Sequence, residues 1–285
     1  MQDIELLKER SRLYKPLYNS LKKKNIKYNE YLILGEIFIN LKDQLKIKNL
    51  VSRYILDSIK SFHDKRIKYS PSIIKKYEPE ILALPNITPN GVIVPKKENI
   101  RSYFKLQSFI FKLSSKYCLN KIADKTELCE VRLMRSNKHN YNSNRSYASS
   151  KIHSDTWSGN PCDSKVALFI DGDKNNTINF FKPKKIDRLF FKKKKNYDQA
   201  IRKYGFRKLK KFNYRCLTIF DQTCLHKTMN KNKGLRLSLD FGITLKFVKN
   251  KKTFLKRYKK RFVKKKINYG EIKKLISLKS IHEKY

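Results

Sequence analysis

Hydrophobic positions follow a helical spacing in the first part of this chain. Branched aliphatic residues recur every four positions from Ile47 to Ile59, which places them on one face of an α-helix. Aromatic and aliphatic residues repeat a helical pattern over residues 100–117. Several prolines between these stretches, ending in a Pro-Asn-Gly sequence at residues 89–91, are typical of a linker. We therefore expect residues 1–80 to be helical and a second helical segment to follow the linker.

The pattern changes to alternation from residue 127 onward. Residues 128–134 alternate between apolar and polar side chains, which predicts a half-buried β-strand. An Asp-Gly-Asp sequence at 171–173 lies between two later apolar runs and predicts a hairpin turn. Short strands separated by turn-rich loops favour an antiparallel barrel or jelly roll. The further strands are expected at residues 151–155, 166–170, 177–181, 215–220 and 235–245.

These elements divide the chain into three predicted parts. A helical N-terminal region covers residues 1–95, and a β-rich core that gives the chain its α+β character covers residues 96–248. A basic insertion in this core spans residues 183–214, and a basic C-terminal tail spans residues 249–285. The lysine run at 192–195 favours a solvated loop with a short helix. The functional alternative is that these lysines close over an anionic substrate and bind it.

Composition narrows the class of protein. The chain has 285 residues, of which 40% are hydrophobic and 12% aromatic, and this favours a folded protein with a sizeable core over a disordered one. No apolar run reaches the roughly 18 residues of a membrane-spanning helix, and the N-terminus shows no signal-peptide pattern. The five cysteines show no C-x-x-C spacing, which argues against a zinc site or a disulfide framework. We expect a cytoplasmic protein with reduced thiols, and the sequence leaves its oligomeric state open.

The formal net charge of +44 ordinarily indicates a polyanionic partner. Of the 68 basic residues, however, 53 are lysine and only 15 are arginine, and Asn, Ile, Tyr and Phe are abundant. This profile is typical of translation from an AT-rich genome, whereas specific readers of phosphates and bases use more arginine. We therefore expect no specific nucleic-acid partner. A basic protein that binds nucleic acid or an anionic membrane surface stays as the non-enzymatic alternative.

Four polar residues in the second half of the chain suggest a metal site. His153 and Asp155 stand two positions apart, so on one β-strand both side chains would point the same way. His226 lies between two predicted strands and can supply a third ligand. Two imidazoles and one carboxylate form the set that holds non-haem Fe(II) with open coordination positions. Arg236 offers a planar fork to a carboxylate, and together these residues suggest an iron- and 2-oxoglutarate-dependent oxygenase.

The segments around these residues resemble a known family. The sequences HSDTWSGNP at residues 153–161, HKT at 226–228 and RLSLD at 236–240 look like motifs of the Fe(II)/2-oxoglutarate dioxygenases of the phytanoyl-CoA dioxygenase-like group. Within that group the chain is most similar to oxygenases of carbohydrate and aminoglycoside biosynthesis clusters. The resemblance covers about residues 100–245, fits the N-terminal helices less distinctly and does not include the basic tail.

The resemblance implies a fold and a set of residue roles. The fold would be a double-stranded β-helix, the cupin-like jelly roll, with the N-terminal helices packed on it. Arg236 would bind the distal carboxylate of 2-oxoglutarate, with Thr228 donating a hydrogen bond to the same carboxylate. Ser238 lies on the same predicted strand face as Arg236 and would assist Thr228. The implied Fe(II) ligands are His153, Asp155 and His226.

The implied reaction is hydroxylation by dioxygen, coupled to oxidative decarboxylation of 2-oxoglutarate to succinate. The implied substrate is a small molecule or glycan precursor: a sugar, a nucleotide sugar or a polysaccharide precursor. Desaturation and epimerisation stay open as outcomes. The enzymatic alternative is the same iron centre acting on a protein, lipid or acyl substrate, because a fold does not determine a substrate.

Two further residues are candidates for substrate contact. Trp157 could line the substrate pocket, although packing beside a turn explains a tryptophan there equally well. Asn160 could donate a hydrogen bond to substrate, whereas a turn role before Pro161 is the plainer interpretation.

Overall fold

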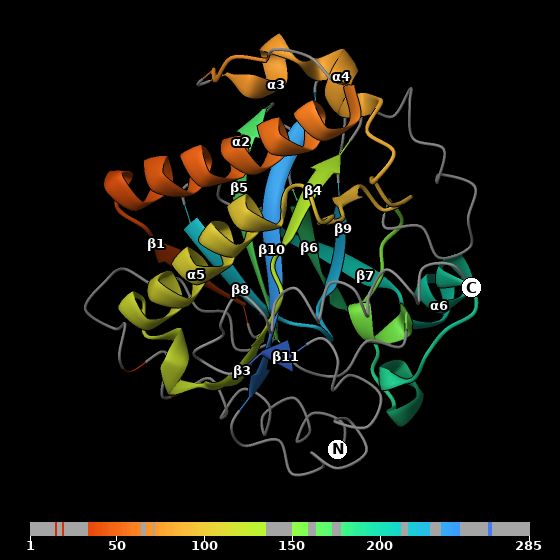
Figure 1. The fold of residues 1–285 in the computed structure, drawn as a ribbon. Coiled ribbons are helices and arrows are strands. Elements are labelled where there is room, and N and C mark those ends of the chain that lie inside the picture. The colour runs from red at the N-terminus through yellow and green to blue at the C-terminus, as the bar shows by residue number, and fades with distance from the viewer. Residues whose placement is uncertain are drawn as a thin grey trace.

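The computed structural model describes residues 34–63, 67–70, 72–134, 150–158, 164–172, 178–211, 216–228, 235–245 and 262–263, together with Lys15 and Asn19. Within these ranges the chain combines helices with antiparallel sheets (Figure 1), in agreement with the predicted α+β class. Two long helices lie across one face of the larger sheet.

Eight strands of the described residues form the larger sheet, with β10 (Arg236–Leu245) near its centre. The others are β1 (Leu34–Phe38), β2 (Val92–Ile93), β3 (Ala123–Glu127), β4 (Glu130–Met134), β5 (Ser164–Gly172), β8 (Cys216–Asp221) and β11 (Phe262–Val263). The main order is β1-β8-β5-β10-β3-β11. β4 pairs with the first half of β10, and β2 continues the sheet beyond β4. Every one of these pairs is antiparallel.

Three strands of the described residues form a smaller sheet in the order β7-β6-β9. Their bounds are β6 (Ile178–Pro183), β7 (Phe206–Lys211) and β9 (Leu225–Thr228). Phe180 of β6 lies opposite His226 of β9. The Phe180 ring also packs on Phe220 of β8, with the ring centroids 5.1 Å apart. Apolar side chains of the two sheets therefore meet beside His226.

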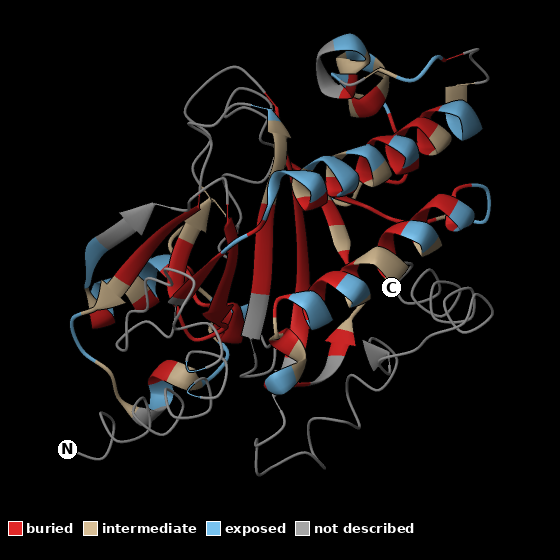
Figure 2. Cartoon of the chain, turned by 90° about the vertical axis from the view of Figure 1, so that its left-hand side faces the viewer, coloured by how far each residue is buried: buried red, intermediate tan, exposed pale blue. Residues whose placement is uncertain are grey.

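The two long helices are α2 (Leu41–His63) and α5 (Ile100–Lys116). Figure 2 shows their buried faces turned toward the sheet and their exposed faces turned outward. The aliphatic stripe from Ile47 to Ile59 is buried, as predicted. In the described part of the chain, no helix is both long and apolar enough to cross a membrane. The shorter helical segments are α3 (Ile73–Lys76), α4 (Glu78–Leu82), η2 (Leu119–Lys121), η4 (Asp155–Ser158), η5 (Arg188–Phe191) and α6 (Tyr197–Tyr204).

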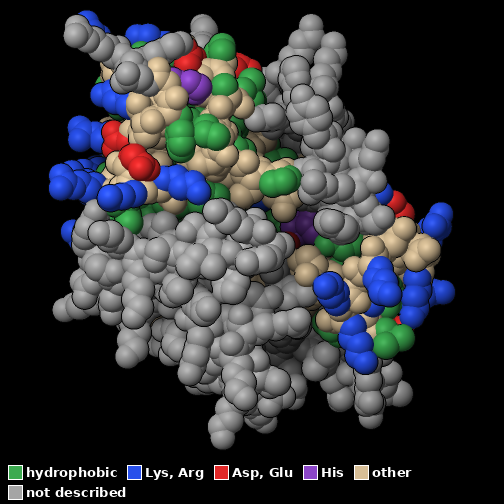
Figure 3. Space-filling model, turned by 45° about the vertical axis from the view of Figure 1, so that its right-hand side comes forward, with side chains coloured by type: hydrophobic (Ala, Val, Ile, Leu, Met, Phe, Trp, Pro, Cys, Tyr) green, Lys and Arg blue, Asp and Glu red, His purple; other side chains and the backbone are tan. Residues whose placement is uncertain are grey.

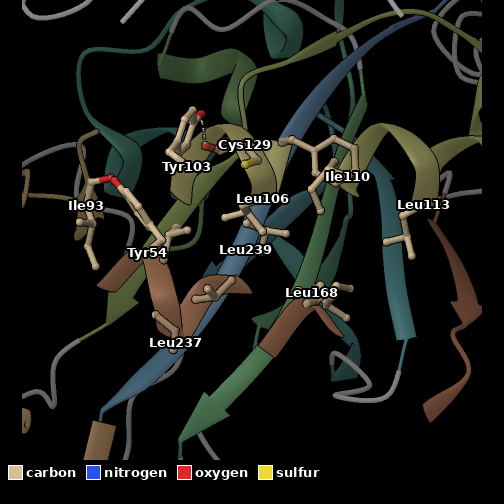
Figure 4. Packing of buried hydrophobic residues seen from close by; sticks show 14 of the residues in the cluster. Tyr54, Ile93, Tyr103, Leu106, Ile110, Leu113, Cys129, Leu168, Leu237 and Leu239 are labelled. Carbon is tan, nitrogen blue, oxygen red and sulfur yellow. Dashed lines mark hydrogen bonds between the residues drawn. The ribbon is translucent and has the colours of Figure 1, made fainter. Parts of the chain in front are cut away.

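The main hydrophobic core lies between these helices and the larger sheet (Figure 4). Leu106 and Ile110 of α5 pack toward Leu237 and Leu239 of β10, and all four side chains are buried. Successive side chains of a strand point to opposite faces, so the residues of β10 between these leucines lie on the other face of the sheet. The apolar face of β10 thus supports the core and leaves the opposite face for polar groups.

Two buried tyrosines attach the helices to the sheet. Tyr54 of α2 donates a hydrogen bond to the backbone oxygen of Ile93 at 2.8 Å. Tyr103 of α5 donates to the backbone oxygen of Cys129, also at 2.8 Å. Burial raises the pKa of both tyrosines well above the ordinary value, so both hydroxyls remain protonated donors.

The structure corrects the helical prediction for residues 1–80 at one place. Leu34–Phe38 forms β1, which pairs with β8 at the edge of the larger sheet. The helix begins only afterwards, where the Asn40 side chain accepts a hydrogen bond from the Asp43 backbone N–H at 2.8 Å. Long-range pairing decides the conformation of such a short segment, because its own periodicity is too brief to do so. Apart from Lys15 and Asn19, residues 1–33 lie outside the described residues.

The predicted hairpin turn at 171–173 is also wrong. β5 ends at Gly172, but β6, the next strand along the chain, belongs to the smaller sheet. Gly172 has a φ of +100°, and a Cβ added there would lie 2.1 Å from the backbone oxygen of Leu235. Glycine is needed at this position because β5 and β10 approach closely.

The other strand predictions give a mixed result. The strands expected within 128–134, 166–170, 177–181, 215–220 and 235–245 are present as β4, β5, β6, β8 and β10. The basic insertion contains the expected short helix, α6, but also β7, which the sequence did not predict. The three-part division of the chain stays a prediction. Strands from the predicted N-terminal region and from the predicted tail pair with strands of the predicted core. β1 pairs with β8, and β11 pairs with β3.

Replacing Leu239 by alanine tests the packing of the main core. We expect Leu239→Ala to lower the free energy of unfolding by about 2 to 5 kcal/mol, because the change leaves a cavity between α5 and β10. Urea denaturation measures this loss. The control is Leu45→Ala on α2, where the leucine is 52% exposed, and a change within about 0.5 kcal/mol is expected. Equal losses in the two variants would contradict the described core.

Candidate metal centre and its cavity

Two backbone hydrogen bonds join His153 to His226. The His153 N–H donates to the His226 oxygen at 2.9 Å, and the His226 N–H donates to the His153 oxygen at 2.8 Å. This isolated antiparallel bridge attaches the segment before η4 to β9. Directly opposite residues of an antiparallel pair carry their side chains on the same side. The two imidazole rings accordingly lie together, with their centroids 4.4 Å apart.

Asp155 reaches the same place from the first turn of η4. The Ser154 hydroxyl holds this segment by donating to the backbone oxygen of Gln222 at 2.8 Å. The Asp155 Oδ1 lies 3.7 Å from Nε2 of His153 and 3.7 Å from Nε2 of His226. All three side chains are buried.

The other nitrogen of each imidazole has a backbone partner. His153 Nδ1 lies 2.8 Å from the Lys151 carbonyl oxygen, and His226 Nδ1 lies 3.0 Å from the Cys224 carbonyl oxygen. A carbonyl can only accept, so Nδ1 carries the proton in each neutral ring and Nε2 keeps its lone pair. Hydrogen bonds of this kind orient histidines that bind metals. The three candidate ligand atoms lie within 4.8 Å of one another, so this buried group could hold a metal ion.

The structure corrects the predicted local geometry of these ligands. His153 forms only the single bridge to β9, and Asp155 belongs to a 3-10 helix, so residues 151–155 are not a continuous strand. His226 lies within β9 rather than in a loop between strands. The two histidines therefore meet by pairing across the chain, whereas spacing along one strand was the expected cause.

A cavity of about 700 Å³ opens in front of these three side chains. Its described lining includes Arg236 and Ser238 of β10 and Thr228 of β9, as well as the candidate metal ligands. The proline-rich stretch that the sequence suggested to be a linker supplies another wall, through residues 85–90. The structure thus brings the six predicted metal and cofactor residues to a single cavity.

Arg236 is a buried cation at this cavity, with a side chain only 3% exposed. Its Nη2 donates to Ser238 Oγ at 3.3 Å. Among the described residues, its Nε has no hydrogen-bond partner and no carboxylate forms an ion pair with it. Burial, and then the charge of Arg132, lower the pKa of Arg236 to about 10, so it stays protonated at neutral pH. A buried charge without a counter-ion is costly, and a carboxylate ligand would offset that cost.

Arg132 of β4 also lines the cavity, but its charge is compensated. Its Nε and Nη2 donate to the two carboxylate oxygens of Asp240, each at 3.2 Å, and Nη2 also donates to Glu130 at 2.7 Å. Its Nη1 donates to the backbone oxygen of Asn90 at 3.0 Å, which ties the proline-rich wall to the sheet. Burial alone would lower the pKa of Arg132, but Asp240 and Glu130 outweigh burial and raise it.

Trp157 is not among the described residues that line the cavity, so its contact with substrate stays a prediction. The ring is completely buried, and its Nε1 donates to the backbone oxygen of Phe190 at 2.7 Å. It packs against Tyr197, with the ring centroids 6.0 Å apart, and Tyr197 in turn stacks on His153 at 5.3 Å with an interplanar angle of 2°. The tryptophan therefore anchors the ligand-bearing segment by packing. Asn160 lies outside the described residues.

The basic insertion reaches the cavity through α6, because Tyr197 lines it. Figure 3 shows Lys and Arg side chains gathered over the lobe that carries α6, and a histidine visible in the recess beside that lobe. The lysines of the 192–195 run lie on this lobe after η5. The two acidic residues of the lobe already have partners, since Asp187 pairs with Lys203 at 2.9 Å and Asp198 pairs with Lys151.

Two cavity residues, Asn86 and Gln222, were missed by reasoning from the sequence. The place of Arg132 at the cavity follows from the pairing of β4 with β10, because Arg132 then stands directly opposite Ser238. Gln222 follows β8 four positions before His226, a proximity that was readable from the sequence. No comparable signal marked Asn86.

Comparisons with known proteins give little further information. No protein-family description matches this chain, and no curated protein does. Among solved structures, the chain is similar to the crystal structure of AviO1 from Streptomyces viridochromogenes Tue57, with 8% sequence identity and a TM-score of 0.41. The alignment covers 74% of this chain and 89% of that chain. The roles of the site residues therefore rest on their own geometry and chemistry.

Removing the uncompensated cation should stabilise the free protein. We expect Arg236→Met to raise the free energy of unfolding by roughly 1 to 3 kcal/mol at neutral pH, because a flexible apolar side chain replaces a buried charge. Chemical denaturation without added ligand measures the change. Arg132→Met is the matched comparison, and it should destabilise the protein because Asp240 and Glu130 lose their partner. A loss of stability in Arg236→Met would show that this guanidinium is already compensated.

Proposed function

We propose that this chain is a non-haem, Fe(II)- and 2-oxoglutarate-dependent oxygenase. The observation that carries the proposal is that one cavity holds both a buried His-Asp-His group and a buried guanidinium without a described ion pair. The first feature suits a metal ion, and the second suits a carboxylate ligand. A cofactor that is at once a metal chelator and a carboxylate fits both requirements.

The donor set supports iron as the metal. His153 and His226 offer two neutral imidazole nitrogens, and Asp155 offers one carboxylate oxygen. This combination is the facial triad of non-haem Fe(II) oxygenases, which leaves positions open for co-substrates. Structural zinc sites use four protein ligands, whereas catalytic zinc can share this three-ligand set, so the buried guanidinium of Arg236 in the same cavity is what favours Fe(II) with 2-oxoglutarate. The three residues found here fit Fe(II) without a further protein ligand.

In this proposal Arg236 binds the distal carboxylate of 2-oxoglutarate. Its planar fork can bind both oxygens of a carboxylate, and burial strengthens such a contact. Ser238 lies beside the guanidinium, and Thr228 lines the same cavity, so both hydroxyls are available to the same carboxylate. Asp240 accepts its hydrogen bonds from Arg132 and acts on Arg236 through its charge, which by itself raises the pKa of Arg236.

The bound cofactors would supply oxidative decarboxylation of 2-oxoglutarate to succinate together with hydroxylation of the substrate by dioxygen. The residues of the chain contribute positioning. The carbonyl oxygens of Lys151 and Cys224 fix the tautomers of the ligand histidines. Tyr197 stacks on His153 and limits rotation of its ring. Trp157 keeps η4, and therefore Asp155, in place through its hydrogen bond to Phe190.

The family resemblance in residues 153–161, 226–228 and 236–240 supports membership of the phytanoyl-CoA dioxygenase-like group. It also supports a double-stranded β-helix core and a sugar, nucleotide-sugar or polysaccharide-precursor substrate. A cytoplasmic location stays a prediction from the sequence. The cavity of about 700 Å³ is large enough for a substrate beside 2-oxoglutarate. A protein, lipid or acyl substrate for the same centre is the alternative.

Anaerobic titration with Fe(II) and 2-oxoglutarate tests the proposal. We expect the weak visible charge-transfer band of an iron-bound 2-oxo acid to form with the wild-type chain. Asp155→Ala should weaken metal binding by at least about 100-fold, because one of three ligands is lost. Arg236→Met should weaken 2-oxoglutarate binding by about 30-fold or more, because the distal carboxylate loses a charged partner.

Two residues that do not line the described cavity provide controls for these variants: Arg202 is exposed, and Asp171 is partly buried in an ion pair with Lys48. Arg202→Met on α6 and Asp171→Asn at the end of β5 should leave the band unchanged. An absent band in the wild-type chain, with no metal bound after reconstitution, would reject the oxygenase. That result would favour the alternative of a non-enzymatic protein that binds a polyanion. The affinity for the polyanion should then fall steeply between low and moderate salt.

A further inference from the structure

Two amide side chains line the cavity with an unused acceptor. Asn86 and Gln222 are each 5% exposed, and the described residues provide no hydrogen-bond partner for Asn86 Oδ1 or Gln222 Oε1. Most buried polar atoms in folded proteins have a partner, and leaving one unmade is costly. An unused acceptor at a cavity wall therefore points to a donor that arrives with a ligand.

Gln222 lies beside the candidate metal centre. It directly follows β8, and its backbone oxygen accepts hydrogen bonds from Ser154 Oγ at 2.8 Å and from the Thr156 N–H at 3.4 Å. These two residues flank Asp155 in the sequence. The backbone of Gln222 is thereby held next to Asp155, and Gln222 lines the cavity at the part where the proposed reaction would take place.

Asn86 occupies the opposite side of the cavity, and its orientation is determined. Its Nδ2 donates to the Val94 oxygen at 2.7 Å, which identifies Oδ1 as the unused atom because a carbonyl oxygen cannot donate. Val94 directly follows β2, while Gln222 directly follows β8. The strands run in the order β8-β5-β10-β4-β2, so four strand spacings separate Gln222 from Val94, the residue that Asn86 contacts. In a flat sheet this amounts to roughly 19 Å.

We propose that the cavity takes an elongated, neutral molecule that carries hydroxyl groups along its length. Gln222 would bind the end of this molecule nearest the His-Asp-His group, and Asn86 would bind the far end. This inference rests on the proposed function only in treating the cavity as the substrate site. Gln222 and Asn86 act in it as specificity-determining residues.

The chemistry of the two amides selects this class of ligand. A hydroxyl donates to an amide oxygen and can also accept from the Gln222 amide nitrogen, so it satisfies both ends of that side chain. An acyl chain would leave both acceptors unpaired, which disfavours it. Ammonium groups prefer carboxylates, and four carboxylates line the cavity. Arg132 engages Asp240 and Glu130, Asp155 belongs to the candidate metal group, and Glu127 has a partner of its own.

Saturation-transfer NMR on the metal-free, full-length chain tests the inference without turnover. The probes are glucose, maltotriose, a disaccharide of glucosamine, and hexan-1-ol. We expect maltotriose to bind more tightly than glucose, because only the longer molecule reaches Asn86, and hexan-1-ol to bind least. Gln222→Leu should weaken maltotriose binding by about five- to tenfold, which corresponds to one neutral hydrogen bond. Gln222→Glu keeps the acceptor oxygens and should retain maltotriose binding.

Thermal unfolding of the same variants gives a second readout. Gln222→Leu should unfold at a higher temperature than the wild-type chain, because it removes a buried polar atom that the free protein leaves unpaired. Thr218→Val is the matched control: its buried hydroxyl on β8 also lacks a described partner but does not line the cavity. It should leave probe binding unchanged.

Four results would overturn the inference. They are a lower unfolding temperature for Gln222→Leu, equal binding of glucose and maltotriose, hexan-1-ol binding as tightly as maltotriose, and tenfold tighter binding of the glucosamine disaccharide. Because no metal is present, a failed iron titration with normal maltotriose binding would reject the oxygenase alone. The reverse outcome would reject the hydroxylated ligand alone.

Discussion

The antiparallel bridge between His153 and His226 is the interaction on which the site depends. Two backbone hydrogen bonds hold together segments that are far apart in the sequence, and they place both imidazoles on one side. η4 then returns Asp155 to within 3.7 Å of both rings. Without this bridge the histidines would have no common position, because His153 belongs to no strand of its own. The surrounding contacts of Trp157 and Tyr197 serve to keep the bridged segment in place.

A second constraint is the division of β10 between two environments. Leu237 and Leu239 complete the core under α2 and α5, whereas Arg236, Ser238 and Asp240 line the cavity. The strand can serve both because successive side chains point to opposite faces. The helices therefore do more than stabilise the sheet: by covering one face of it, they leave the other to the cavity.

Charge compensation gives the cavity its polarity. The two arginines that line the cavity lie on neighbouring strands, yet Arg132 takes Glu130 and Asp240 as partners and leaves Arg236 without an ion pair among the described residues. The free protein thus retains an unmatched cation and two unmatched amide acceptors, Asn86 and Gln222. Such groups lower the stability of the folded protein when the site is empty, and they bind a ligand when it is occupied. Proteins commonly lose some stability at functional sites in this way.

The long helices, most central strands and the identity of the candidate ligands could be predicted from the amino-acid sequence alone. Helical and alternating periodicities report which face of an element is buried, and two histidines in matching motif halves are readable without coordinates. Only the tertiary structure decided that residues 34–38 form a strand and that β5 and β6 enter different sheets. It also decided which arginine remains uncompensated. These features follow from pairing between distant segments, and local spacing carries no information about such pairing.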